Sequence, residues 1–217
     1  MRTITIKGMG SVSVKPDLIV VSMELETKDK EYEQTMALAS QKIDSLNKSL
    51  EGIGFEKNSI KTTNFDIIID YESVKKDGQY QQVFCGYKCN HNLKVEFDFD
   101  TKRLAEVLNE ISKCVAKPEF SISFTVRDKE VVSRELLKSA TQNAKEKAEI
   151  LCSASGVRLG NLLSIDYNWG ELNIRSNTNY SVSRNCKMET LACFSSVEIQ
   201  PENIDLNDTV TFVWEII

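Results

Sequence analysis

The chain has 217 residues, with 27 Lys and Arg against 32 Asp and Glu, and therefore a formal net charge of −5. A hydrophobic fraction of 41% and a charged fraction of 27% are ordinary for a globular protein and exclude a disordered or fibrous chain. The mild acidity and the absence of a basic run argue against nucleic-acid binding. A single histidine, His91, excludes most histidine-based catalysis and multi-histidine metal sites.

The start of the chain predicts no export signal. Residues 3–6 alternate in the manner of a strand, whereas a secretory signal needs an uninterrupted apolar stretch followed by small residues. No other window is apolar over the length that a membrane span requires. We therefore expect a cytoplasmic protein without membrane insertion.

Two-residue alternation and one helical stripe organise the first half of the chain. Apolar residues between Tyr32 and Ile53 recur at spacings of three and four, which indicates an amphipathic helix that begins near Asp29. Elsewhere apolar and polar residues alternate, as in strands with one buried face. The expected elements are strands at 3–6 and 19–26 with a turn at 8–11, then the helix, a strand at 64–71, a polar hairpin loop at 73–79 and a long strand that ends near Phe99.

The second half predicts two further helices. Asp100 or Thr101 can cap a short helix that Pro118 ends, and Asp128 caps a long helix that Gly156 stops. Alanines on the apolar stripe of the long helix permit close packing on a sheet or another helix. Strands are expected at 120–126, 162–165 and 210–216, and a long Asn- and Ser-rich variable loop at 167–195.

The order of these elements predicts an α+β fold. Hairpins precede helices, and the strands alternate instead of being continuously apolar, which favours an antiparallel or mixed sheet with helices packed on one face. No linker divides the chain, so we expect a single domain over 1–217. A division into two packed lobes, about 1–100 and 101–217, remains open.

The six cysteines are better explained as thiols than as disulfide or metal ligands. The chain is long enough for a core and lacks an export signal, which favours reduced cysteines. Cys85, Cys89 and His91 fall on one face of the long strand, where residues four apart are separated by about 13 Å. That distance is too long for one disulfide or one zinc ion, and Cys89 with His91 would need ligands from elsewhere. We expect no metal and no other cofactor.

The loop at 167–195 is the candidate recognition region. Long loops with little periodicity are either functional or disordered, and this one contains Trp169, Tyr180 and Arg184. Cys186 and Cys193 lie in the same polar region and are the candidate reactive thiols, although no neighbouring pattern favours their thiolate forms.

The remaining motifs are more simply structural than catalytic. Residues 8–10 have two glycines before a strand, whereas a nucleotide-binding loop needs a following helix and a third glycine, so a tight turn is favoured. His91 lies in the middle of a strand, and no Gly-x-Ser-x-Gly motif accompanies it. Asp66 and Asp70 lie on one face of a strand and suit a solvated sheet surface. We expect no catalytic residues and no enzymatic activity.

Four separated segments share the pattern of one known family. They read IKGMGSVSVKPD at 6–17, GYKCNHNLKV at 86–95, the helix after Phe124 that runs into GVRLGNLLSI at 156–165, and IQPENI at 199–204 followed by VTF at 210–212. In this order, over nearly the whole chain, they resemble SIMPL-domain proteins, the YggE-like group of bacterial proteins.

The resemblance implies an α+β domain that assembles into higher oligomers, in some members ring- or channel-shaped. It also implies a link to oxidative or envelope stress, and in a eukaryotic relative the binding of a kinase. The family has no established catalytic residues, so none can be transferred to this chain. Most bacterial members look exported, and this chain departs from them because it shows no signal. Position 89 is typically small in the family, which implies that Cys89 packs.

Two functional hypotheses follow. The first is a non-enzymatic, self-assembling SIMPL-domain protein, a homo-oligomer that acts as a scaffold or binding module in a stress response. Sheet edges and helix faces would drive its assembly, and the loop at 167–195 would bind an unidentified protein partner. The alternative is thiol-based protection against oxidative stress, which predicts a thiol of lowered pKa that consumes peroxide.

Overall fold

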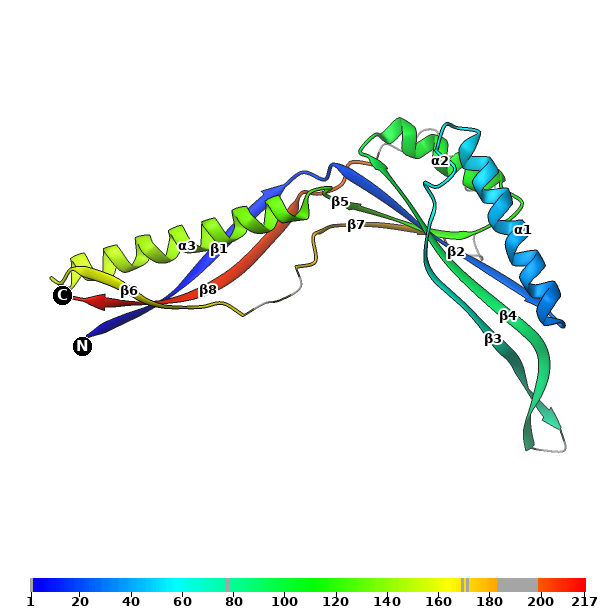
Figure 1. Cartoon of the computed structure of the whole chain (residues 1–217), viewed down its shortest axis with the longest axis horizontal. Coiled ribbons are helices and arrows are strands. Elements are labelled where there is room, and N and C mark those ends of the chain that lie inside the picture. The colour runs from blue at the N-terminus through cyan, green and yellow to red at the C-terminus, as the bar shows by residue number, and fades with distance from the viewer. Residues whose placement is uncertain (1, 77–78, 169, 171, 183–198) are drawn as a thin grey trace. The chain divides into compact units, whose positions relative to one another are not determined.

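The computed structural model of the chain describes residues 2–76, 79–168, 170, 172–182 and 199–217 (Figure 1). The described strands form two antiparallel sheets, and the helices pack on them, which confirms the α+β fold. In chain order the elements are β1 (Thr3–Val14), β2 (Leu18–Asp29), α1 (Tyr32–Glu51), β3 (Lys61–Lys76), β4 (Gln79–Asp98), α2 (Thr101–Lys113), β5 (Glu119–Thr125), α3 (Lys129–Ala154), β6 (Leu159–Asp166), β7 (Arg175–Val182) and β8 (Ile204–Ile216).

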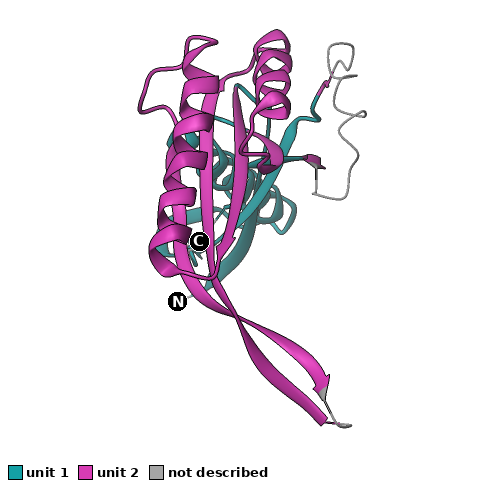
Figure 2. Ribbon diagram, turned by 90° about the vertical axis from the view of Figure 1, so that its right-hand side faces the viewer, with its two compact units in different colours: residues 1–17, 125–177, 201–217 teal, residues 18–124, 178–200 magenta. Residues whose placement is uncertain are grey.

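The chain divides into two compact units, each with its own sheet (Figure 2). The first unit comprises residues 1–17, 125–177 and 201–217, and the second comprises 18–124 and 178–200. The first unit is assembled from distant segments because β8 pairs antiparallel with β1 along the whole length of β1. The units therefore differ from sequential lobes at about 1–100 and 101–217, since pairing between the two ends of the chain sets the division.

In the first unit, β1 and α3 pack backbone against backbone. A β-carbon at Gly8 would lie 2.1 Å from the carbonyl oxygen of Ala140, and one at Gly10 would lie 2.2 Å from the next carbonyl along the helix face. Ala140 is completely buried at this contact. The expected turn at 8–11 is wrong, because β1 runs without interruption over Thr3–Val14 and its glycines allow the helix to approach.

The long helix α3 begins and ends as the sequence predicts. The carboxylate of Asp128 accepts a hydrogen bond from the backbone N–H of Val131 at 3.0 Å, and Gly156 follows the helix with a φ of 71°. Among the described helices, none combines the length and hydropathy needed to cross a membrane. The buried stripe of α3 consists of Val132, Leu136, Ala140, Ala144, Ala148 and Cys152.

In the second unit, α1 and α2 cover the same face of the sheet, which has the strand order β3-β4-β2-β5-β7 (Figure 2). Alternation decides this face, because Ile19 and Val21 are completely buried while Ser22 and Glu24 are exposed. Asp100 caps α2 by accepting hydrogen bonds from two backbone N–H groups of its first turn. The core includes Ile19, Val21, Met23, Leu25, Leu46, Leu50, Leu93, Val95, Leu104, Val107, Leu108, Ile111, Phe120, Ile122 and Phe124.

Strand β7 lies inside the segment expected to be a loop, 167–195. Ser176 is buried and Thr178 and Tyr180 are half-buried, while the residues between them are exposed. The Ser176 hydroxyl donates a hydrogen bond to the carbonyl oxygen of Glu202 at 2.8 Å. Because hydroxyl groups occupy the inward positions, the strand lacks the apolar alternation by which the other strands were predicted.

Candidate functional site

Strands β3 and β4 extend past the rest of their sheet as a two-stranded hairpin (Figure 1). The pairing of β2 with β4 ends at Asp29 opposite Tyr87, whereas β3 stays paired with β4 as far as Lys76 opposite Gln79. Within the described residues, this outer part of the hairpin therefore has no third strand beside it. We call it the arm, and it consists of residues 71–76 and 79–85.

A β-bulge marks the place where the arm leaves the sheet. The register of β3 and β4 shifts between Asp70 and Tyr71, and Cys85 is the extra residue on β4. The next residue, Gly86, has a φ of 141°, and a β-carbon on it would lie 2.2 Å from the carbonyl oxygen of Asp29. Only glycine fits this close approach to the end of β2, so the place where the arm leaves the sheet depends on this one residue.

The arm and the adjoining part of β3 expose large apolar side chains. Tyr80 is 75% exposed, Tyr71 53% and Phe84 49%, although aromatic residues are usually buried. Tyr71 and Phe84 lie opposite each other on one face of the arm, and exposed apolar patches mark interaction sites in soluble proteins. The exposed apolar residues of β3 and β4 are Phe65, Ile68, Ile69, Tyr71, Val74, Tyr80, Val83 and Phe84.

Edge-to-face aromatic contacts connect the arm to the first turn of α1. The ring of Tyr71 lies 6.2 Å from that of Phe84, which lies 5.7 Å from Tyr87, and Tyr87 lies 5.6 Å from Tyr32. Each such pair contributes about 0.5–1.5 kcal/mol beyond area burial. The contacts hold an exposed apolar face in place before any partner arrives.

Strand β3 is the outer strand of its sheet. Its outer edge presents backbone N–H and C=O groups that have no partner strand among the described residues, and such an edge can template pairing with another chain. A second bulge interrupts the edge at Thr63, whereas β3 keeps a regular alternation from Asn64 to Lys75. The regular part of the edge thus includes the arm.

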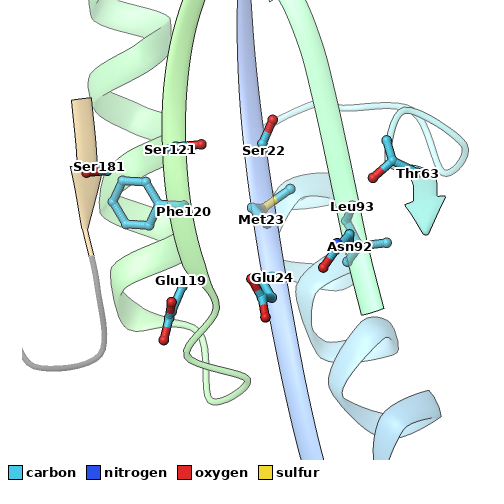
Figure 3. A pocket seen from close by; sticks show the side chains of 10 residues that line it. All are labelled: Ser22, Met23, Glu24, Thr63, Asn92, Leu93, Glu119, Phe120, Ser121 and Ser181. Carbon is cyan, nitrogen blue, oxygen red and sulfur yellow. The ribbon is translucent and has the colours of Figure 1, made fainter. Parts of the chain in front are cut away.

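The same sheet carries an open pocket of about 340 Å³ with polar and apolar lining residues (Figure 3). The Asn92 Oδ1 atom is buried and has no hydrogen-bond partner in the described part of the chain. The lining has no His or Cys side chain, and the described residues hold no group of three or more His, Cys, Asp or Glu suited to a metal ion. The lining residues are Ser22, Met23, Glu24, Thr63, Asn92, Leu93, Glu119, Phe120, Ser121 and Ser181.

The described cysteines fall into one exposed and three buried thiols. Cys89, Cys114 and Cys152 are buried, and burial, with a smaller contribution from the nearby Asp66 carboxylate, raises the pKa of the Cys89 thiol. Cys85 is exposed, and its Sγ atom lies 3.8 Å from a carboxylate oxygen of Glu72. The expected alternation from Cys85 to Cys89 is wrong because the bulge at Cys85 interrupts it.

His91 lies on β4 beside an aromatic ring and a hydroxyl group. Its Nε2 atom is 2.9 Å from the Thr62 hydroxyl, and its ring meets that of Phe65 edge to face at 4.9 Å. Burial lowers the pKa of His91 below the usual 6.5. The surroundings favour a neutral imidazole that helps to fix β3 against β4.

The residues proposed for recognition and thiol chemistry are only partly described. Tyr180 lies on β7, half-buried against the core of the second unit. Trp169, Arg184, Cys186 and Cys193 lie outside the described residues, so their roles remain predictions.

The arm was not predicted from the sequence. The segment 73–79 was expected to be a polar hairpin loop, yet β3 continues to Lys76 and β4 begins at Gln79. Tyr71, Val74 and Tyr80 have high strand propensity and were the available signal. The strands of the arm have no buried face, so charged and amide residues lie between these three residues and the apolar alternation typical of a strand is lost.

Comparisons with known proteins identify the chain at the level of its family. A search of the curated proteins found no match. The pattern of the SIMPL family, described as a protein of unknown function (DUF541), matches residues 4–214. The match takes in both compact units and the arm. Because it covers nearly all of the 217 residues, the chain belongs to the SIMPL family.

Proposed function

We propose that this SIMPL protein is a non-enzymatic, self-assembling scaffold or binding module that serves in a stress response. The observation that supports assembly is the arm, a two-stranded extension with exposed aromatic side chains and an outer edge that no described strand covers. The stress link comes from the resemblance described above.

The energetics of the arm favour a partner. An isolated two-stranded hairpin is marginally stable in water, and three or more strands are needed for independent stability. Burying one large apolar side chain contributes about 1.5–3 kcal/mol, and the arm offers several that are now half exposed. Association through the arm would therefore bury these side chains, which would stabilise the hairpin and hold the associated chains together.

The solution mass by light scattering behind a sizing column, with and without reductant, tests this proposal. We expect a discrete oligomer whose mass is the same in both conditions. The double variant Tyr71→Ser/Phe84→Ser should lower the mass because it removes apolar contacts from the arm. Ile150→Ser/Leu151→Ser is a matched control, since these residues are 66% and 49% exposed on α3.

Two outcomes would contradict different parts of this proposal. A monomeric wild-type protein at all concentrations would contradict self-assembly. An equal loss of mass in the control variant would contradict the role of the arm and leave assembly intact.

The exposed thiol of Cys85 is the observation that favours the alternative, thiol-based protection. That function would use Cys85, or the two candidate thiols Cys186 and Cys193. It predicts that at least one of the three is alkylated much faster than an ordinary thiol at neutral pH, because the thiolate is the nucleophile. Uniformly slow alkylation of all six cysteines, followed by mass spectrometry, would exclude it.

A further inference from the structure

We propose that the arm pairs with the arm of a second copy, strand β3 antiparallel to strand β3, about a twofold axis beside Ser73. This inference rests on the proposed self-assembly, and it adds the surface and the register. The two arms would then form one four-stranded sheet in the order β4-β3-β3-β4.

The geometry of such a pair is restrictive. Two copies of one strand can pair antiparallel only about a twofold axis perpendicular to the sheet, and residues opposite each other must lie on the same face. The axis therefore passes beside one residue, which faces its own copy. The choice of that residue determines which residues of the two copies lie opposite each other along the rest of the strand.

Charge excludes most of these registers. An axis beside Asp70 or Glu72 would set that carboxylate against its own copy, and an axis beside Tyr71 would set Asp70 against Glu72. Axes beside Ile68 or Ile69 would set Asp66 against Asp70 or Glu72. Like charges directly opposite each other destabilise a pair of strands.

Among the axes beside arm residues that avoid an acid against an acid, the one beside Ser73 gives the longest pairing, over residues 70–76 of β3. Glu72 then faces Val74, and Asp70 faces position 76, which is a lysine in the sequence. Tyr71 faces the second copy's Lys75, and an ammonium group is attracted to the face of an aromatic ring. Tyr71 is 53% exposed in one copy, so it has surface available for this contact.

Registers nearer the body of the sheet meet a different obstacle. An axis beside Ile67 would pair residues 64–70 only, because the bulge at Thr63 breaks the ladder beyond Asn64, and it would leave the arm without a partner strand. Bulges of this kind blunt an edge against pairing. Among the registers that engage the arm, the charge pattern selects the axis beside Ser73.

Cysteine cross-linking tests the register in the full chain. The variants Ser73→Cys and Lys75→Cys would be made in a background in which Cys85, Cys186 and Cys193 are serine. Opposite residues of an antiparallel pair have Cα atoms about 4.5–5.5 Å apart, within the range of a disulfide. We expect Ser73→Cys to form a disulfide dimer on mild oxidation.

The control is Lys75→Cys, on the same face two residues away. With the axis beside Ser73, its two copies would be separated by four strand positions, about 13 Å, which is too far for a disulfide. We expect at least tenfold slower cross-linking of this variant at equal protein concentration. Cross-linking of the control as fast as that of Ser73→Cys would overturn the register.

The mass of the non-oxidised background protein separates this inference from the proposed function. An oligomer in which Ser73→Cys does not cross-link would overturn the arm-to-arm pairing while self-assembly stands. A monomer at every concentration, without cross-linking, would overturn both. A dimer joined through Ser73→Cys alone supports both.

Discussion

At the scale of single residues, small or neutral side chains decide how this chain packs. Gly86 lets the end of β2 approach β4, and Cys89 is completely buried with a raised pKa, in agreement with a packing role. His91 is the one histidine of the sequence, and burial lowers its pKa below 6.5. Each of these residues acts through the space or polarity around it.

The titration of His91 should link stability to pH. Because its pKa is lower in the folded chain than the usual 6.5, the unfolded chain binds the proton more readily. The contribution of the neutral imidazole to the free energy of unfolding is fully present above the pKa that His91 has in the unfolded chain. It is lost as the pH falls through 6.5 toward the lower pKa of His91 in the folded chain. We expect a smaller free energy of unfolding by urea at pH 5.5 than at pH 7.5.

A matched variant isolates this effect from the carboxylates. His91→Gln should reduce the difference between the two pH values, because it removes the imidazole and leaves every acidic residue in place. NMR titration of the single imidazole gives the pKa directly. A midpoint at or above 6.5 in the folded protein would contradict the assignment.

At the scale of elements, the contact between β1 and α3 holds the first unit together. Gly8 and Gly10 remove the side chains that would otherwise keep the helix away, and the alanines of α3 complete the contact. Close packing of this kind tolerates little added volume. The two glycines are therefore among the most sensitive positions of β1.

Substitution at Gly10 should destabilise the fold. A β-carbon there would lie 2.2 Å from a backbone oxygen of α3, and overpacking of this kind costs about 1–3 kcal/mol. Gly10→Ala should lower the thermal midpoint and the free energy of unfolding accordingly.

Gly52→Ala is the control for this substitution. Gly52 has helical angles, and the nearest atom to a β-carbon there would be 3.4 Å away. Alanine at such a site leaves stability unchanged or raises it by up to about 1 kcal/mol. Equal losses in the two variants would show that the helix–strand contact is not the cause.

At the scale of the whole molecule, self-assembly should make stability depend on protein concentration. An assembly that forms only from folded chains adds about 1.4 kcal/mol per dimer for each tenfold rise in concentration. Shared between two chains of this size, that gain corresponds to a rise of about 1–3 °C in the thermal midpoint.

Calorimetry over a hundredfold range of concentration measures this dependence. The variant Tyr71→Ser/Phe84→Ser should unfold at a midpoint that does not change with concentration, because it assembles poorly. A concentration-independent midpoint in the wild-type protein would contradict assembly in that range.

The candidate site was harder to predict than the fold. The alternation in β2 and the cap Asp128 were predicted correctly, and Asp100 is one of the two caps predicted for α2, because burial and capping act over a few neighbouring residues. The arm was read as a loop, since its strands lack a buried face and therefore lack apolar alternation. For the same reason β7, with hydroxyl groups such as Ser176 inward, was missed.

The sequence by itself determined the elements whose pattern is local. These include the three helices, the N-terminal signals of α2 and α3, and most strands. They also include the family, because its motifs can be recognised from their order along the sequence alone. Tertiary structure decided what depends on distant partners. Gly8 and Gly10 proved to be a helix contact and not a turn, because α3, which they meet, lies more than a hundred residues away. Likewise the pairing of β8 with β1 divides the chain into its units, and the end of β2 at Asp29 leaves the arm without a third strand among the described residues, since strand neighbours are determined in space.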